Sequence, residues 1–258
     1  MRTLKLVIAY DGTDFAGWQR QAATRSVQAS IEDALAPIEG GRVVITGAGR
    51  TDAGVHAAGQ VASVSLNSAI PAADLQRALN ATLATDIRIL HLEDVRADFN
   101  ARFDARQKTY RYSIYCGAVM PPQWRRYAWH VPQALDVEAM QASAALLLGE
   151  HDFSAFQAAG SDVKTTTREV IVSSVARLAT NADNPDFFPA AIGNLLRYQI
   201  TGTGFLRHMV RNIVGTLVDA GRGRRPIHDI PAILASRDRA QASATAPPHG
   251  LTLWSVDY

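Results

Sequence analysis

Residues 3–10 read TLKLVIAY, and Asp11-Gly12 follows directly. The larger apolar side chains fall at every second position from Leu4 to Tyr10, which places them on one face of an extended strand. The Asp-Gly pair is a frequent turn sequence and predicts where this strand ends. The chain therefore opens with a β-strand that buries one face, and the rest of the fold is built outward from it.

The segment after this strand alternates between helical and strand patterns. Ser26 can cap a helix whose apolar side chains recur along one face as far as Ile38, and Gly40-Gly41 ends it. A second helix begins at Pro71 and carries a leucine at every fourth position up to Leu83. Strands are predicted at 42–46, 60–66 and 87–92. The resulting order, β-α-β-β-α-β, is that of the ferredoxin-like split βαβ motif.

The second half of the chain repeats this order. Strands are predicted at 108–115, 168–178, 194–200 and 251–256, helices at 137–148, 205–220 and 227–234, and a polar loop at 181–189. We therefore expect an α+β protein of two ferredoxin-like, RRM-like units, 1–104 and 105–258. Their mixed, largely antiparallel sheets are expected to form a central basic cleft.

Length and composition exclude several classes of protein. The 258 residues can bury a full core, and 47% of them are hydrophobic, which rules out a mainly disordered or collagen-like chain. No apolar run approaches the ~20 residues of a membrane helix, and Asp11 comes too early for a signal peptide. The single cysteine, Cys116, excludes an intramolecular disulfide and a multi-cysteine metal site. A cytoplasmic protein without membrane contact is expected.

The charges are unevenly distributed along the chain. Residues 102–130 hold six cations and one acid, and residues 197–225 also hold six cations and one acid, so each segment carries a net charge of +5. The remaining residues hold 14 cations and 22 acids, a net charge of −8. This segregation predicts a positive face on an otherwise acidic protein, which favours a polyanion such as nucleic acid as the partner.

Residues 47–56, GAGRTDAGVH, form the most informative loop. The sequence lacks the Gly-Lys-Ser/Thr of a P-loop, and its glycine spacing does not fit a dinucleotide-binding fingerprint. It presents one carboxylate, Asp52, two residues from Arg50, and a nearby cation favours the ionised form that a nucleophile or base requires. A simple turn aspartate is the alternative. Asp52 and His56 alone are too few ligands for a metal site.

Two further segments carry candidate binding residues. On the strand 108–115, Tyr110 and Tyr112 share a face; Tyr112 is expected in the core, whereas Tyr110, beside basic residues, can stack on a base. On the helix 205–220, Arg207 and Arg211 are four residues apart and share a face, where a phosphate or carboxylate between them would relieve their repulsion. His208 is expected at the surface. The loop 10–20, with exposed aromatic and basic groups, is compatible with RNA contact and with loop packing.

Seven motifs in this order resemble the bacterial tRNA pseudouridine synthase A family over nearly the whole chain. They are Tyr10–Gly12, Gly17–Arg20, Ser26–Gln28, Gly49–His56, Phe99–Phe103, Lys108–Tyr112 and His208–Gly215. The Gly-Arg-Thr-Asp-Ala-Gly-Val-His block is the most specific of them. Two features depart from the family pattern: the loop at 181–189 is longer, and the chain ends directly after its last strand.

The resemblance implies a function and a set of site residues. Asp52 is the catalytic nucleophile, Tyr110 lies against the base, and Arg211 pairs with the catalytic carboxylate. Arg50, Arg207 and His208 complete the expected substrate-binding set. The implied enzyme isomerises uridine to pseudouridine at positions 38, 39 and 40 of the tRNA anticodon stem-loop, acts as a homodimer, and needs no cofactor or metal.

Two other functions compete with this one. A non-catalytic protein with tandem RRM-like units has the same element order, but an RRM displays aromatic residues on its central strands, and the strand at 60–66 has none. A small-molecule hydrolase that uses Asp52 leaves the two basic segments unexplained. A glycoside hydrolase would normally show two carboxylates flanking the scissile bond. The residues alone do not choose whether Asp52 attacks the sugar or the base, or removes a sugar proton.

Overall fold

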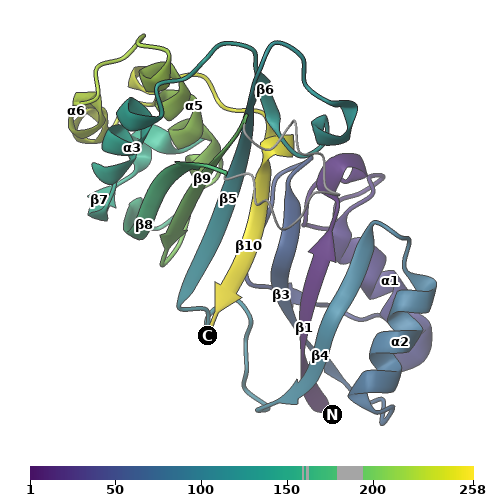
Figure 1. The fold of residues 1–258 in the computed structure, drawn as a ribbon. Coiled ribbons are helices and arrows are strands. Elements are labelled where there is room, and N and C mark those ends of the chain that lie inside the picture. Colours follow the sequence, from purple (N-terminus) through teal and green to yellow (C-terminus); the bar gives the residue numbers. More distant parts are fainter. Residues whose placement is uncertain (159, 161–162, 179–193) are drawn as a thin grey trace. The chain divides into compact units, whose positions relative to one another are not determined.

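The computed structural model spans residues 1–258 and describes all of them except 159, 161–162 and 179–193 (Figure 1). The protein is α+β, as the sequence predicts, with mostly antiparallel strands. The chain forms two compact units, residues 1–108 with 252–258, and residues 109–251. The first unit therefore includes the C-terminal strand, which the sequence analysis placed at the end of the second unit.

The sheet of the first unit has the strand order β4-β1-β3-β10, with β2 also paired to β3. The strands are β1 (Arg2–Tyr10), β2 (Thr46–Gly47), β3 (His56–Leu66), β4 (Ile87–Val95) and β10 (Leu251–Asp257). In β1, Leu6 lies opposite Ala62 of β3 and Leu92 of β4, both antiparallel. β10 is parallel to β3, with Thr252 opposite His56. This pairing joins residues almost 200 positions apart, which no local pattern in the sequence encodes.

Two helices, α1 (Val27–Glu39) and α2 (Ala72–Thr82), lie on one side of this sheet (Figure 1). The Ser26 side chain accepts a hydrogen bond from Ala29 N–H, and Gly40, at a φ of 76°, ends the helix in the left-handed conformation, as its sequence pattern predicts. The core between the helices and the sheet is mainly apolar, although α1 also buries Gln28 and Glu32, which are hydrogen-bonded to each other. It contains Leu4, Leu6, Ile8, Ile31, Leu35, Leu75 and Leu79, each at most 1% exposed. Burying each of these side chains contributes roughly 1.5–3 kcal/mol.

The strand predicted at 42–46 is much shorter than expected. Only Thr46 and Gly47 pair with β3, opposite Ser63 and Ala62. Val44 is 60% exposed, so this segment does not have the two-sided packing that a central strand requires. The short strand leads directly into the glycine-rich loop.

The sheet of the second unit has the strand order β5-β9-β8-β7, with β6 also paired to β5. The strands are β5 (Gln107–Cys116), β6 (Trp129–Val131), β7 (Gly149–Asp152), β8 (Thr167–Arg177) and β9 (Leu195–Gly202). β8 is antiparallel to both neighbours, with Val175 opposite Tyr198 of β9 and Val170 opposite Gly149 of β7. β6 and β7 were not predicted from the sequence. Both strands are short, and β7, Gly-Glu-His-Asp, has no alternation of apolar and polar residues.

In the described part of the second unit, three α-helices are present: α3 (Val137–Ala145), α5 (Met209–Gly221) and α6 (Asp229–Ser236). Val210, Ile213 and Leu217 of α5 are buried as predicted. Gly215 of α5 lies against the backbone of Ala244, so close that a Cβ atom would fall 1.9 Å from the carbonyl oxygen. The predicted loop at 181–189 lies outside the described residues. In the described part of the chain, no helix has the length and apolar character of a membrane span.

Candidate active site

The loop that carries Asp52 joins β2 to β3, and its first half is fastened along β3. Ala48 N–H donates to the Val61 carbonyl at 2.8 Å. Gln60 Nε2 donates to the Gly49 carbonyl at 3.0 Å. Because both partners belong to a paired strand, the backbone leading to Asp52 has a fixed path.

The second half of the loop is fastened to the segment that follows β1. Trp18 N–H donates to the Thr51 carbonyl at 3.1 Å, and Gly54 N–H donates to the Phe15 carbonyl at 3.3 Å. The hydroxyl oxygens of Tyr10 and Thr51 are 2.8 Å apart and share a hydrogen bond. Ala53 and the half-buried Asp52 lie between these anchors, so the position of Asp52 is set by bonds on both sides of it.

Close backbone contact between the two loops depends on glycine. Gly17 has a φ of 103°, and a Cβ atom there would lie 2.7 Å from the Thr51 carbonyl oxygen. Gly54, within the loop that carries Asp52, has a φ of 76°. Only glycine adopts these conformations without strain, so both residues are needed for the observed approach.

The aromatic residues of the loop 10–20 are buried, which differs from the exposed groups that the sequence analysis expected. Phe15 is 3% exposed and Trp18 is 2% exposed. Arg20 binds Glu32 and Asp33 of α1, each at 2.6 Å, and its hydrogen bond to Asp33 is the main cause that raises its pKa. Of the two interpretations left open, the structure supports packing: the loop is a support for the Asp52 loop.

His56, at the end of the loop, has a structural role in this arrangement. It is 4% exposed, and its Nδ1 accepts a hydrogen bond from Gly12 N–H at 3.0 Å. This bond needs an unprotonated Nδ1, so the 3.2 Å contact between Nδ1 and Asp11 Oδ1 is not an ion pair in this tautomer. Among the described residues, no group of three or more His, Cys, Asp or Glu is arranged to hold a metal ion.

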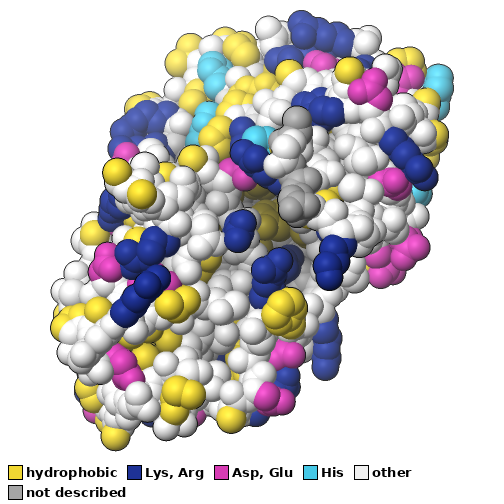
Figure 2. Space-filling model, turned by 180° about the vertical axis from the view of Figure 1, so that it is seen from behind, with side chains coloured by type: hydrophobic (Ala, Val, Ile, Leu, Met, Phe, Trp, Pro, Cys, Tyr) yellow, Lys and Arg dark blue, Asp and Glu magenta, His cyan; other side chains and the backbone are white. Residues whose placement is uncertain are grey.

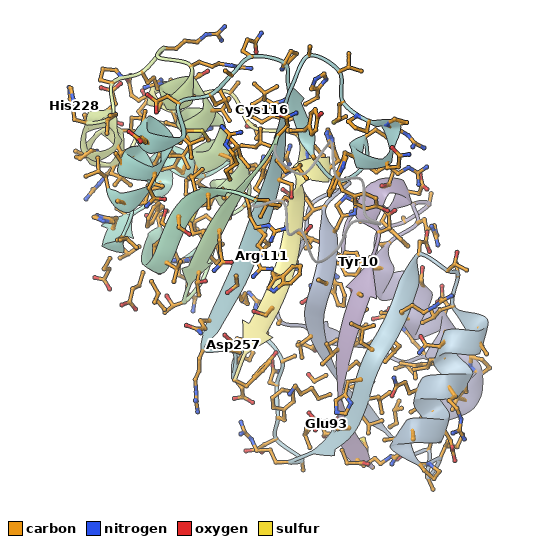
Figure 3. The ribbon with its side chains drawn as sticks, in the orientation of Figure 1. Tyr10, Glu93, Arg111, Cys116, His228 and Asp257 are labelled. Carbon is orange, nitrogen blue, oxygen red and sulfur yellow. The ribbon has the colours of Figure 1, made fainter. Side chains whose placement is uncertain are left out.

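Tyr10, at the end of β1, and Arg111, on β5, are labelled in Figure 3. Tyr10 is 5% exposed, and burial raises the pKa of its hydroxyl far above the ordinary value. The Tyr10 hydroxyl therefore stays protonated and keeps its hydrogen bond with the Thr51 hydroxyl.

Arg111 Nε donates to Gln199 Oε1 at 2.9 Å. Burial, and next the charge of Arg197, lower the pKa of Arg111.

In the second unit, Tyr110 and Tyr112 of β5 occupy different environments. Tyr112 is fully buried, its hydroxyl donates to the Pro247 carbonyl at 2.8 Å, and it belongs to the core as predicted. Tyr110 is 7% exposed and packs edge-on against Phe205, with ring centroids 5.1 Å apart. Tyr110 thus lies beside the turn that leads to Arg207 and His208.

The helix predicted from Phe205 begins only at Met209. His208 adopts the left-handed conformation, with a φ of 60°, and so interrupts the helical backbone before α5. Arg207 is exposed and precedes this break, whereas Arg211 lies in the first turn of α5. The expectation that Arg207 and Arg211 share a helix face is therefore wrong, because the geometry of four-residue spacing applies only within a continuous helix.

Arg211 is tied to the segment at 242–246 by two hydrogen bonds. Its Nε donates to the Ala246 carbonyl at 2.8 Å, and Ala246 N–H donates to the Arg211 carbonyl at 3.1 Å. The guanidinium is therefore held at a defined position on α5.

A buried asparagine supports the same region and was missed by the sequence analysis. Asn212 is fully buried; its Nδ2 donates to the Phe156 carbonyl at 2.7 Å, and its Oδ1 accepts bonds from Arg239 and Thr245. A polar residue between the apolar positions 210 and 213 was the only signal in the sequence.

The second basic segment places three of its six cations near an acid. Arg222 and Arg224 lie 3.7 and 3.8 Å from Asp219, and Arg225 binds Ser243 and lies 3.5 Å from Asp229. Figure 2 shows that some Lys and Arg side chains of one face lie beside acidic side chains, while others do not. Of the two acids, Asp219 belongs to the segment and is already counted in its net charge of +5, and Asp229 lies four residues beyond its end. The segment therefore keeps a positive net charge after folding.

The predicted site residues fall into two groups. Asp52 and the exposed Arg50 both lie in the loop between β2 and β3 of the first unit. Tyr110, Arg207, His208 and Arg211 belong to the second unit, where the contact between Tyr110 and Phe205 links β5 to the turn before α5.

Comparison with known proteins gives this arrangement a context. The sequence model of a family described as tRNA pseudouridine synthase matches residues 6–104 and 143–258. The chain is 45% identical to tRNA pseudouridine synthase A of Solidesulfovibrio magneticus, over all of this chain and 92% of the relative. It is 43% identical to the protein of that name from Acetivibrio thermocellus and 44% identical to the one from Moorella thermoacetica, over the full length of both chains in each pair.

The chain belongs to the tRNA pseudouridine synthase family. The resemblance drawn from the seven motifs is thereby confirmed, and with it the assignment to an isomerase family. The two matched segments contain both Asp52 and Arg211, whereas Tyr110 lies between them. Family membership favours an enzyme over the tandem RRM-like binding protein that the element order also allowed.

Proposed function

We propose that this protein isomerises uridine to pseudouridine at positions 38, 39 and 40 of the tRNA anticodon stem-loop, with Asp52 as the nucleophile. The observation that carries the proposal is the position of Asp52, a carboxylate in a loop fastened on both sides, in a chain of the tRNA pseudouridine synthase family. A reacting group held in this way has lost most of its freedom before the substrate binds, which lowers the entropic cost of reaction.

The chemistry needs only one carboxylate. Isomerisation breaks the bond between ribose C1′ and uracil N1, turns the base, and joins C5 to C1′, while the proton on C5 is replaced by one on N1. No water is added and the base does not leave, so a second carboxylate to activate water is unnecessary. Asp52 can act by addition to the sugar or the base, or by removal of a sugar proton.

The other site residues have supporting roles in this proposal. Tyr110, backed by Phe205, stacks on the uracil and restricts its motion. Arg211 keeps the catalytic carboxylate ionised, a role taken from the family resemblance. Arg50, Arg207 and His208 bind the RNA. The target base must be flipped out of its stem, and contacts to phosphates offset the cost of a few kcal/mol.

The partners follow from the same proposal. The substrate is tRNA, the working form is a homodimer in the cytoplasm, and the residues ascribed to catalysis require no cofactor or metal. Family membership supports the tRNA substrate.

The experiment is pseudouridine formation on an unmodified tRNA transcript with uridines at positions 38 to 40, without added metal. We expect product with the wild type and none with Asp52→Ala or Asp52→Asn, while both variants bind the transcript. Asp98→Asn is the matched control, since Asp98 is an exposed aspartate of the same unit.

Two results would contradict the proposal. Turnover by Asp52→Asn at the wild-type rate would remove the carboxylate from the chemistry. Loss of RNA binding as large as the loss of turnover would make Asp52 a structural residue.

A further inference from the structure

The turn at residues 99–104, which follows β4 and a short turn at 96–99, is held by several hydrogen bonds. The N–H groups of Arg102 and Phe103 both donate to Asn100 Oδ1, at 2.9 and 3.2 Å. Asn100 N–H in turn donates to Asp104 Oδ2 at 2.9 Å, and Asp104 also binds Arg96 at 2.6 Å. These bonds hold the backbone of the turn in one conformation.

Ala101 anchors the turn to the sheet of the first unit. It is fully buried in a cluster with Ala48 and Val61. Ala101 N–H donates to Ser63 Oγ at 3.1 Å, and the Tyr258 hydroxyl donates to the Ala101 carbonyl at 2.7 Å.

The anchor places the turn on the face of the sheet that the helices leave open. In β1, Leu6 and Ile8 point into the core beneath α1 and α2, so Val7, one residue out of phase, points to the opposite face. Val7 lies opposite Val61 and packs against the cluster that holds Ala101. Ala48 of the same cluster begins the Asp52 loop, so this loop and the turn start from one anchor on one face.

The turn exposes an aromatic side chain. Phe103 is 78% exposed, and it is the one exposed phenylalanine among those that the structure describes. The guanidinium of Arg102 lies 5.6 Å from its ring centroid. Arg102 and Arg106 are both exposed, while the nearby acid, Asp104, is occupied by Arg96. An exposed ring beside cations offers an apolar surface and positive charge together.

We propose that Phe103 is a stacking platform for an unpaired base of the RNA substrate, with Arg102 beside it to bind the phosphate backbone. Bases present a flat π-face whatever their sequence, and a ring carried on a hydrogen-bonded turn needs no rearrangement of the backbone when a base covers it. The inference rests on the proposed function for the identity of the substrate, and it adds a binding residue outside the reacting site.

The test measures the affinity and the rate separately. Phe103→Ala, Phe103→Leu and Phe103→Tyr are compared with the wild type for the Kd of the unmodified tRNA transcript and for the single-turnover rate at saturating RNA. Leu90→Ala is the matched control, since Leu90 is an exposed apolar residue of the same unit at 53% exposure.

We expect the Kd to rise by about 5- to 100-fold for Phe103→Ala and for Phe103→Leu, the range that one stacked base supplies. Phe103→Tyr keeps the ring and should bind within about threefold of the wild type. The single-turnover rate at saturation and the Tm should be unchanged in all three variants. Leu90→Ala should match the wild type throughout.

Several outcomes would overturn the inference. A Kd for Phe103→Ala equal to that of the wild type would show that no base stacks there. Wild-type binding by Phe103→Leu would show a generic apolar contact. A change in oligomeric state for Phe103→Ala would assign the ring to a contact between copies of the chain. Failure of the proposed function is a separate result, absence of pseudouridine from the wild type, and it leaves the Kd comparison readable.

Discussion

The Asp52 loop is fixed mainly through backbone groups, of β3 and of the loop that follows β1, whereas the segment around Arg211 is fixed by side chains. Trp18 N–H and the Phe15 carbonyl hold the first, at positions where glycine permits close approach. Asn212 and the Arg211 side chain hold the second. Different substitutions should therefore disturb the two regions. A side chain added at a glycine should displace the Asp52 loop, and a shortened side chain should destabilise the segment around Arg211.

The largest effect is expected from Asn212→Ala. The change removes three hydrogen bonds of a fully buried side chain, to the Phe156 carbonyl, Arg239 and Thr245, which should lower the free energy of unfolding by about 3–4 kcal/mol. Urea denaturation measures the loss. Thr245→Ala removes one of these bonds and should cost about 1 kcal/mol. An Asn212→Ala variant as stable as the wild type would contradict the view that side chains hold this region.

Gly17→Ala should disturb the close contact between the loop that follows β1 and the Asp52 loop. The added Cβ meets the Thr51 carbonyl, and the φ of 103° is strained for alanine, so we expect a loss of about 2–3 kcal/mol in stability. Displacement of the neighbouring Asp52 should lower the rate of pseudouridine formation by about 100-fold. Gly41→Ala, where a Cβ meets nothing within 4 Å, is the control and should keep the wild-type rate. Equal rates for both variants would show that the approach of the loops is not needed.

Tyr10→Phe makes a smaller change next to the Asp52 loop. It removes the hydrogen bond to Thr51 and keeps the buried ring, so stability should fall by about 1 kcal/mol, and turnover should fall with the Kd for tRNA unchanged. Tyr112→Phe in the second unit removes a bond of the same length, to the Pro247 carbonyl, and should lower stability similarly without the effect on turnover. If both variants lose turnover alike, the bond to Thr51 has no special role in placing Asp52.

The smallest effect concerns a pair remote from both regions. The hydrogen bond from Lys5 lowers the pKa of Glu93 in the folded protein. A lowered folded pKa gives stability that is present above the unfolded value of about 4.3 and is lost as the pH falls through the folded pKa. Glu93→Gln should therefore be less stable than the wild type at neutral pH, with a difference that disappears at low pH. Urea denaturation across pH 2–7 measures this, and a difference independent of pH would show that the carboxylate charge is not involved.

Much of the candidate site was predictable because its signals are local. The block at 49–56 contains Asp52, Arg50 and the glycine that the turn requires, and all three lie within a few residues of one another. The interruption at His208 was not predictable, since its left-handed backbone depends on how the turn at 205–208 packs. Burial of Phe15 and Trp18 was missed for a related reason: turn-rich sequence is usually exposed, and here a second loop covers it.

The amino-acid sequence was enough to predict most of the helices and strands, the α+β class, the glycine-rich loop with its single carboxylate, and membership of the tRNA pseudouridine synthase family. Three features came from the structure alone: the pairing of β10 with β3, the addition of β6 and β7 to the second sheet, and the burial of Phe15 and Trp18. Side-chain periodicity and turn residues act over a few positions along the chain. Strand pairing and loop packing join residues that come close only after folding, so no local pattern encodes them.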